Sequence, residues 1–275
     1  MTNMNPPDAD RVFAGSIPQL YERYLVPLIF EPYAADIASR AALRQPSRIL
    51  EVAAGTGVVT RQLANALPPG ASIVATDLNQ PMLDQAAAAG TARPVEWHQA
   101  DAIQLPYPDK AFDVVVCQFA VMFFPDKQKA FSEARRVLRP GGCFMFNVWD
   151  RIEQNEFADT VTHALESPFS DNPPRFLARV PHGYHDLSVI ARDLAGGGFD
   201  QLPEFTTLAA RSRADSPRIP AVAYCQGTPL RSEIEARGAS RLVEATEIAT
   251  AAIASRFGSD AVDGKIQAHV ITIER

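Results

Sequence analysis

The hydrophobic and polar positions of residues 46–150 alternate between two kinds of segment. Five short apolar runs predict β-strands, at residues 48–53, 72–76, 95–99, 112–117 and 143–149. Three segments with helical spacing lie between them, at residues 58–67, 81–89 and 126–138. The 112–117 run has the unbroken apolar character of a strand that is covered on both faces. This order of elements predicts an α/β fold with an open, mostly parallel sheet and helices on both sides.

The regions on either side of this alternation follow other patterns. Residues 11–45 have helical spacing, which Pro27 and Pro32 interrupt. Residues 151–187 contain four prolines with aromatic residues between them, which is typical of an inserted surface segment. The chain is therefore expected to comprise an N-terminal helical lid at 1–45, a core at 46–150, an insertion at 151–187, a core continuation at 188–212, a helical cap at 213–263 and a final core strand at 264–275.

Composition and charge restrict the class of protein. Of the 275 residues, 47% are hydrophobic and 21% are charged, which is ordinary for a soluble globular chain. The 26 basic and 32 acidic residues give a net charge of −6, and no basic run is present, so a nucleic-acid partner is disfavoured. The longest apolar run, at 112–124, is shorter than the ~18 residues that a membrane helix needs.

Cysteine usage and the N-terminus indicate a compartment. Cys117, Cys143 and Cys225 are too few and too scattered for a disulfide framework or a zinc site, so no metal site is expected. The first ten residues are polar and lack the apolar stretch of a secretory signal. We therefore expect a cytoplasmic protein with no membrane partner, and a homodimer is left open because no exposed apolar face can be told from core.

The chemistry-bearing segment is the glycine-containing turn between the first strand and the first helix, at residues 51–57. Glycines at Gly55 and Gly57 let the backbone turn sharply and approach a ligand closely. Asp77 ends the second strand, twenty residues beyond Gly57, where a carboxylate can accept hydrogen bonds from the two hydroxyls of a ribose. Ligands of open parallel sheets bind outside the carboxyl ends of the strands, which is where all these residues fall.

A turn of this kind can bind either of two kinds of ligand. A dinucleotide fold favours a third glycine where the helix begins, and that position is Thr60 in this chain. Glu51 would repel a pyrophosphate, whereas it suits a ligand that carries ammonium and sulfonium charges. The Gly-x-Gly alone is weak evidence, but together with Glu51, Asp77 and Asp101 it favours the second kind of ligand.

Five motifs occur in a fixed order over about a hundred residues. They are EVAAGTG at 51–57, ATDLNQPML at 75–83, QADA at 99–102 followed by LPY at 105–107, FDVVV at 112–116, and RVLRPGG at 136–142. With these motifs, residues 48–149 resemble the core of class I S-adenosylmethionine (SAM)-dependent methyltransferases, and more narrowly the ubiquinone/menaquinone-biosynthesis-like (methyltransferase type 11) group. The resemblance implies a Rossmann-like, seven-stranded, mostly parallel sheet whose last strand is antiparallel, with helical cap insertions.

The resemblance also implies roles for individual residues of a SAM site. Asp77 would bind the ribose hydroxyls, and Leu78 and Met82 would lie against the adenine. Asp101 would accept from the adenine amino group, and the Ala102 N–H would donate to the ring. Ala53, Gly55 and Gly57 in the turn would line the methionine part, and Gln118 and Phe119 would offer their backbone to it. Glu51 would hold the loop or meet the amino group. Tyr24 resembles a cofactor-binding residue of the N-terminal lid, although a helix that packs on the sheet explains it equally well. The family usually has glycine in place of Ala53, and an alanine is compatible with that position if its φ is negative.

The reaction implied is transfer of a methyl group from SAM to a small-molecule acceptor, with S-adenosylhomocysteine (SAH) as the product. The acceptor would bind under the cap formed by residues 151–187 and 213–263. A general base is needed only if the acceptor must lose a proton, and His182 and His185 are the weak candidates for that role. The alternatives are a non-catalytic SAM-binding regulatory or scaffold protein and an NAD-dependent oxidoreductase, in that order.

Overall fold

The structure is a computed structural model that describes residues 10, 13, 15–238 and 240–275. The chain folds into two compact units. The sheet unit contains residues 31–148, 184–208 and 268–275, and the helical unit contains the described residues up to 30 together with 149–183 and 209–267. The strands β6 (Glu204–Ala214) and β7 (Val262–Glu274) have residues in both units.

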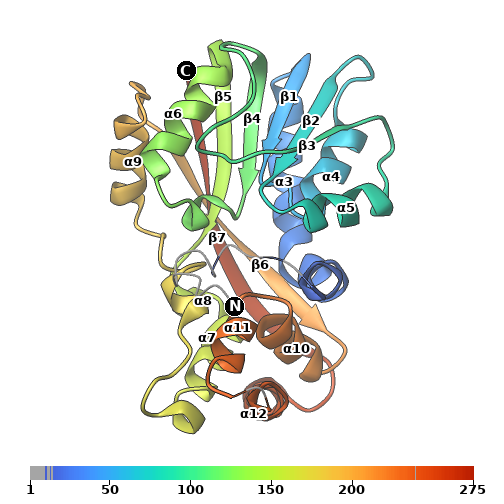
Figure 1. The fold of residues 1–275 in the computed structure, drawn as a ribbon, viewed down its shortest axis with the longest axis vertical. Coiled ribbons are helices and arrows are strands. Elements are labelled where there is room, and N and C mark those ends of the chain that lie inside the picture. The colour runs from blue at the N-terminus through green and yellow to red at the C-terminus, as the bar shows by residue number, and fades with distance from the viewer. Residues whose placement is uncertain (1–9, 11–12, 14, 239) are drawn as a thin grey trace. The chain divides into compact units, whose positions relative to one another are not determined.

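The seven strands form one sheet in the order β3-β2-β1-β4-β5-β7-β6 (Figure 1). The first five are β1 (Arg48–Val52), β2 (Ser72–Asp77), β3 (Glu96–Gln99), β4 (Phe112–Gln118) and β5 (Leu138–Trp149). They are mutually parallel, and Leu50 of β1 is paired with Val74 of β2 on one side and Val115 of β4 on the other. Hydrogen bonds from Gly141 N to Arg275 O and from Arg275 N to Gly142 O join β5 to the end of the chain in antiparallel fashion. The mostly parallel sheet with an antiparallel last strand is confirmed.

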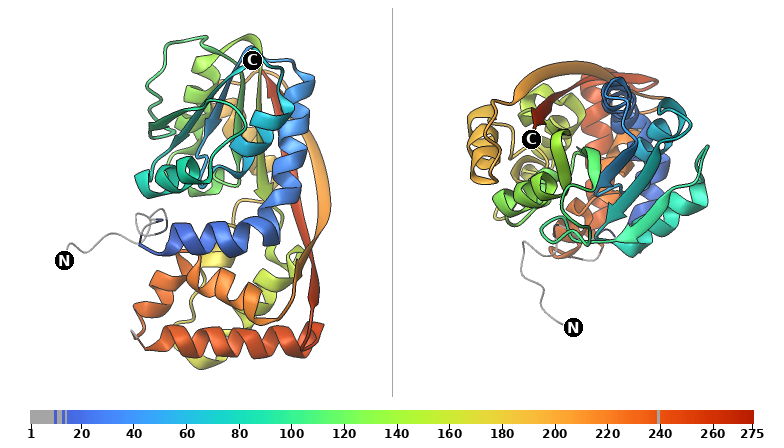
Figure 2. Two further views of the ribbon diagram at one scale, coloured as in Figure 1. Left: turned by 90° about the vertical axis from the view of Figure 1, so that its right-hand side faces the viewer. Right: turned by 90° about the horizontal axis from the view of Figure 1, so that it is seen from above.

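Helices cover both faces of the sheet in the sheet unit. One group contains α3 (Glu31–Leu43), α4 (Val58–Ala66) and α5 (Gln80–Ala89), and the other contains α6 (Lys127–Val137) and α9 (Leu187–Gly196), as Figure 2 shows. Apolar side chains of β1 and β4 are almost fully buried between them, because a parallel strand between two helical layers has no solvent-facing side. Phe131 of α6 packs on Phe144 and Phe146 of β5 and is fully buried.

The direction of these strands determines where the candidate ligand-binding residues lie. Because β1 to β5 are parallel, their carboxyl ends lie along one edge of the sheet. The chain continues outward from the central strand in both directions, to β2 on one side and to β4 on the other, so β1 and β4 flank the point where the strand order reverses. Ligands of open α/β sheets bind at this point.

The helical unit is built around α12 (Arg241–Phe257), which packs against α10 (Arg218–Gln226) and α7 (Glu156–Ala164) (Figure 2). Its other helices are α2 (Ile17–Leu20), η1 (Tyr21–Phe30), η3 (Ile152–Gln154), η4 (Ser167–Phe169), α8 (Phe176–Arg179) and α11 (Leu230–Glu235); η2 (Val121–Phe123) belongs to the sheet unit. Ala245, Ala249 and Ile253 of α12 are fully buried, and their spacing explains the apolar stripe of the sequence.

The structure differs from the sequence-based expectation in three elements. Helical structure continues from Ile17 to Leu43 through both prolines, because Pro27 lies in the π-helix η1, whose wider turn relieves the clash of the ring with the preceding turn, and Pro32 lies in the first turn of α3. Residues 151–187 form helices with buried Phe157 and Phe176 rather than an irregular surface segment. Strand β5 begins directly after α6, at Leu138, so the Pro-Gly-Gly sequence lies inside the strand.

Two kinds of feature are absent from the described residues. No helix there combines the length and the apolar character needed to cross a membrane. Within the same residues, no group of three or more His, Cys, Asp or Glu side chains is arranged to hold a metal ion.

Replacing Ile253 by Ala is expected to lower the free energy of unfolding of the helical unit by about 2–4 kcal/mol, because it removes a fully buried side chain and leaves a cavity. Urea unfolding measures the loss. Val243 lies on the same helix and is 67% exposed, so Val243→Ala is the control and should change stability by less than about 0.5 kcal/mol. Equal effects of the two substitutions would contradict the packing described for α12.

Candidate functional site

The turn between β1 and α4 has an unusual backbone. Ala53, Gly55 and Gly57 have φ angles of +56°, +58° and +82°, all in the left-handed region. The N–H of Ala54 donates to the carbonyl of Thr76 at 2.8 Å, which joins the turn to the end of β2. The turn therefore takes a tight, fixed path across the carboxyl edge of the sheet.

The two glycines serve different purposes. A Cβ on Gly57 would lie 3.1 Å from Ala86 Cβ and 3.2 Å from the Trp97 ring, so this glycine lets α5 and β3 pack closely on the start of α4. A Cβ on Gly55 would meet only the methyl group of Met82, at 3.6 Å. Gly55 is therefore required by its φ angle rather than by lack of space.

The backbone conformation of Ala53 differs from the negative φ angle that an alanine at this position is expected to require. Its φ is positive, although an alanine was expected to be compatible with the position only at negative φ. The left-handed conformation costs a residue with a Cβ about 1–2 kcal/mol, and the hydrogen bonds around the turn impose it. The chain thus keeps the backbone path for which a glycine is the usual residue.

Asp77 connects the turn to the end of β2. Its Oδ2 accepts the N–H of Gly55 at 2.8 Å, and its Oδ1 accepts the N–H of Asn79 at 2.8 Å. The residue is only 7% exposed, and burial raises the pKa of the carboxyl, while the N–H groups of Asn79 and Gly55 oppose that rise. Oδ1 also accepts a long hydrogen bond from Asn79 Nδ2 at 3.5 Å, so Oδ2 has the lone pair that is open to a further donor, and a ligand donor at Oδ1 would replace the Asn79 side chain.

Glu51 lies beneath the turn rather than at its surface. Its carboxyl is buried, and Oε2 accepts a hydrogen bond from the Thr60 hydroxyl at 2.5 Å. Burial raises the pKa of Glu51 to about 8, although the Thr60 hydrogen bond and the charge of Arg61 lower it. Thr60, the position of the absent third glycine, therefore anchors Glu51 to the first turn of α4.

The segments after β2 and β3 contribute a second group of side chains. Leu78 is 40% exposed, which is high for a large apolar residue, whereas Met82 is buried. Asp101 Oδ1 accepts the N–H of Ile103 at 3.1 Å, so this carboxylate does stabilise a turn. Ala102 is buried and lines a small apolar pocket.

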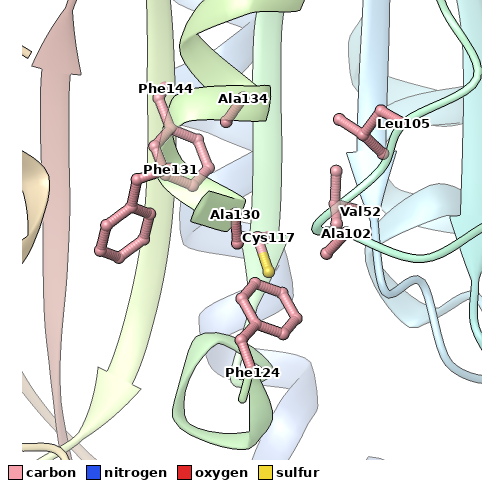
Figure 3. Close-up of a pocket in the computed structure, with 9 residues that line it drawn as sticks. All are labelled: Val52, Ala102, Leu105, Cys117, Phe124, Ala130, Phe131, Ala134 and Phe144. Atoms are coloured by element: carbon pink, nitrogen blue, oxygen red, sulfur yellow. The ribbon is translucent and has the colours of Figure 1, made fainter. Parts of the chain in front are cut away.

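A small apolar pocket lies beneath Ala102 and Leu105 (Figure 3). It is lined by Val52, Ala102, Leu105, Cys117, Phe124, Ala130, Phe131, Ala134 and Phe144. It has room for about one water-sized group and none of its lining side chains is charged, so it is a packing defect of the core rather than a ligand site. Burial also raises the pKa of the Cys117 thiol, which keeps this cysteine protonated.

The ends of β4 and β5 meet at Gln118, Phe119 and Asn147. Gln118 is paired with Asn147 across the two strands, and Phe119 follows with a φ of +48°. Asn147 is fully buried, and sequence analysis did not select it. A single amide within the apolar run 143–149 was the available signal, since a polar side chain in a buried strand requires hydrogen-bond partners.

The remaining candidates are placed by the helical unit or by α9. Tyr24 lies on η1 in the helical unit, with the Arg23 guanidinium 5.0 Å from its ring centre. His182, also in the helical unit, is buried against Trp149, and its Nδ1 is 2.9 Å from the carbonyl oxygen of Asp150. In a neutral ring Nδ1 therefore donates and Nε2 is the basic atom. His185 belongs to the sheet unit and precedes the Asp186 cap of α9.

Eleven of the expected residues thus lie in the sheet unit along its carboxyl edge. Glu51 lies near the end of β1, and Ala53, Gly55 and Gly57 follow it; Asp77 ends β2, and Leu78 and Met82 follow it; Asp101 and Ala102 follow β3; and Gln118 ends β4, with Phe119 directly after it. A seven-stranded sheet with this order and this edge defines the Rossmann-like fold of the class I methyltransferases.

Comparison with known proteins agrees. The model of the methyltransferase domain family matches residues 50–146. The ubiquinone/menaquinone biosynthesis C-methyltransferase UbiE of Ectopseudomonas mendocina is 34% identical over 135 residues, which are 48% of this chain and 48% of that protein. The chain thus spans about half the length of the curated relatives it matches. Residues 50–146 thus match the methyltransferase domain family, and the chain is similar to the UbiE enzymes over about half of its length.

Solved structures extend the likeness in fold beyond that domain. Phosphoethanolamine N-methyltransferase 2 of Haemonchus contortus, in complex with phosphomonomethylethanolamine and S-adenosylhomocysteine, aligns with 99% of this chain and 61% of its own, at 19% identity and a TM-score of 0.58. The [4+2]-cyclase SpnF aligns with 88% of this chain and 80% of its own, at 19% identity and a TM-score of 0.51. Since the second is titled a cyclase, the fold alone does not identify the reaction.

Replacing Ala53 by Gly is expected to raise the free energy of unfolding by about 0.5–1 kcal/mol, because the relief of left-handed strain exceeds the added entropy of the unfolded chain. Urea unfolding again provides the measurement. Ala87 is an exposed residue of α5, and Ala87→Gly should lower stability by about 1 kcal/mol. A loss of stability in both variants would contradict the conformation assigned to Ala53.

Glu51 is expected to make stability pH-dependent. An acid whose pKa is raised on folding binds its proton more tightly in the folded state, so its contribution is greatest below the unfolded pKa of 4.5 and is lost as the pH rises to about 8. Glu51→Gln should therefore stabilise the protein relative to the wild type at pH 8 more than at pH 5. Unfolding midpoints at the two pH values test this, and an equal difference at both would show that Glu51 is charged in the folded state.

Proposed function

We propose that the protein is a SAM-dependent methyltransferase that acts on a small-molecule acceptor. The observation that carries the proposal is the arrangement of Asp77 with the left-handed turn at 53–57. A buried carboxylate with a lone pair left on Oδ2 lies directly beside a left-handed turn in which Gly55 is partly exposed. Membership of residues 50–146 in the methyltransferase domain family supports the same activity.

The residues at the edge fit the parts of SAM. The two oxygens of Asp77 match a vicinal diol: Oδ2 can accept one hydroxyl in addition to the Gly55 N–H, and at Oδ1 a second hydroxyl would replace the long hydrogen bond from Asn79 Nδ2. The partly exposed Leu78 offers an apolar surface for the adenine. Asp101 keeps an oxygen for the adenine amino group, because its turn hydrogen bond uses Oδ1. The H. contortus neighbour, which is in complex with S-adenosylhomocysteine, is consistent with this ligand.

The electrostatics favour a cationic ligand over a pyrophosphate. Glu51 and Asp77 place two carboxyl groups under and beside the turn, and the pKa of Glu51 is raised by burial and, to a smaller extent, by the charge of Asp77. The ammonium and sulfonium charges of SAM would be stabilised there, whereas a dinucleotide phosphate would be repelled. Thr60 stands at the position where a dinucleotide-binding turn has its third glycine, and its hydroxyl donates to Glu51.

When bound, SAM supplies an activated methyl group on a sulfonium. The role of the chain is to hold the ligand at the carboxyl edge, to orient the methyl group toward the acceptor and to exclude water. No general base is required for acceptors that attack without losing a proton. Where one is required, His182 is the better candidate, because its hydrogen bond to the Asp150 carbonyl fixes the ring and makes Nε2 the basic atom.

Replacing Asp77 by Asn is expected to weaken binding of SAH by about ten- to a hundredfold, because a charge-assisted acceptor is lost and one amide N–H faces a backbone N–H. Calorimetric titration measures the affinity. Asp84→Asn on α5 is the matched control, since that carboxylate is exposed and bonds only to Gln80 among the described residues. Unchanged affinity in Asp77→Asn would refute the assignment of this site.

Catalysis is tested separately by incubating the wild type with methyl-labelled SAM and a panel of small phenolic, quinol and amine acceptors. The proposal predicts label transfer to at least one class, and slower transfer by Asp77→Asn at SAM concentrations below saturation. Tight SAM binding without transfer to any of them would favour the non-catalytic SAM-binding protein instead.

A further inference from the structure

Asn147 connects the ends of β4 and β5 through its side chain. It is fully buried, and its strand position is directly opposite Gln118. Its Oδ1 accepts the N–H of Phe119 at 3.0 Å, and its Nδ2 donates to Gln118 Oε1 at 3.3 Å. One buried amide therefore holds two consecutive residues at the carboxyl edge of the sheet.

These contacts determine which way both amides face. A backbone N–H can only donate, so the atom of Asn147 that contacts Phe119 must be the oxygen. The other end of that amide is then the NH2 group, which can only donate, so the atom of Gln118 that it meets must also be an oxygen. The NH2 group of Gln118 is thereby directed away from Asn147.

This NH2 group has no partner within the part of the chain that the structure describes. Gln118 Nε2 is buried and makes no hydrogen bond to any described residue. A buried donor without an acceptor is unfavourable, and such groups in native proteins call for a physical reason. The next residue, Phe119, is held at a φ of +48°, a second unfavourable feature at the same place.

The register places this donor beside the turn that follows β1. Val116 of β4 is paired with Glu51 of β1, so Gln118 is level with Ala53, where the left-handed turn begins. The other polar side chains here, Glu51 and Asp77, are carboxyl groups, which suit an ammonium and hydroxyl groups. A ligand carboxylate at this place requires a donor, and the Gln118 NH2 group provides one.

We propose that Asn147 is a positioning residue that orients the side-chain amide of Gln118 so that its NH2 group donates to the carboxylate of the amino-acid part of SAM. The inference rests on the proposed function, because it assumes that SAM binds at this edge. It assigns to the Gln118 side chain a role beyond the backbone contact expected from the sequence, and to Asn147 a role that acts only through Gln118.

The test compares SAM with decarboxylated SAM, which keeps the adenosine, the sulfonium and the ammonium group and lacks only the carboxylate. Calorimetric titration of the full-length protein is carried out with the wild type, Gln118→Met, Asn147→Ser and the double variant. Serine keeps an acceptor near the Phe119 N–H, which also donates to the Asn147 main-chain carbonyl, but it is too short to reach Gln118. Asn147→Ala is the second variant if Asn147→Ser does not fold.

Gln118→Met should weaken SAM binding about tenfold or more, and Asn147→Ser about three- to tenfold, with little change for decarboxylated SAM. The double variant should bind SAM no more weakly than Gln118→Met, because Asn147 acts only by orienting the amide. A general structural defect would weaken both ligands alike.

Equal losses for the two ligands, or additive losses in the double variant, would overturn the inference while leaving the cofactor site intact. Absence of SAM binding by the wild type would instead refute the proposed function, and this inference with it.

Discussion

The carboxylate of Asp77 is the constraint on which the site depends. It accepts one N–H from the turn after β1 and one from the start of the segment that leads into α5. A single buried group therefore fixes two loops that the parallel sheet brings to the same edge. Without it, the left-handed conformations at Ala53 and Gly55 would lose a partner that offsets their cost. The polar group that we propose to bind the ribose is thus also the one that shapes the turn beside it.

The edge is arranged as a series of chemically different partners along the strand order. Acidic groups follow β3 and β2, the bare backbone of the turn follows β1, and an amide follows β4. Behind this series lie groups that hold those partners in place: Thr60 bonds to Glu51, and Asn147 bonds to Gln118. The specificity of such a site comes from matching each part of an extended ligand to one strand end. The apolar pocket below it contributes only packing.

Much of the sheet unit was predictable from the sequence, because periodicity and turn residues act locally. The first four strands end within one residue of the prediction, and Asp77 and the turn at 51–57 lie where their positions after strands require. The helices at 151–187 were not predicted, because the prolines lie between these short helices or at the start of η4, and their spacing resembles that of a loop when burial is unknown. The same limit applies to Pro27, which a π-helix accommodates.

Side-chain orientation was beyond the reach of the sequence. The positive φ of Ala53 follows from hydrogen bonds across the edge, not from the alanine itself. The role of Asn147 depends on which of its two amide atoms meets a backbone N–H, and that is decided only by the pairing of β4 with β5. Local patterns identify the strand ends, whereas the geometry between strands decides what each end can bind.

The central claim is that this edge binds SAM, and calorimetric titration of the wild-type protein with SAM, SAH and NADH tests it most directly. The account predicts saturable binding of SAM and SAH, at affinities on the order of micromolar (about −8 kcal/mol), and no binding of NADH. Binding of NADH alone, or of none of the three, would contradict it.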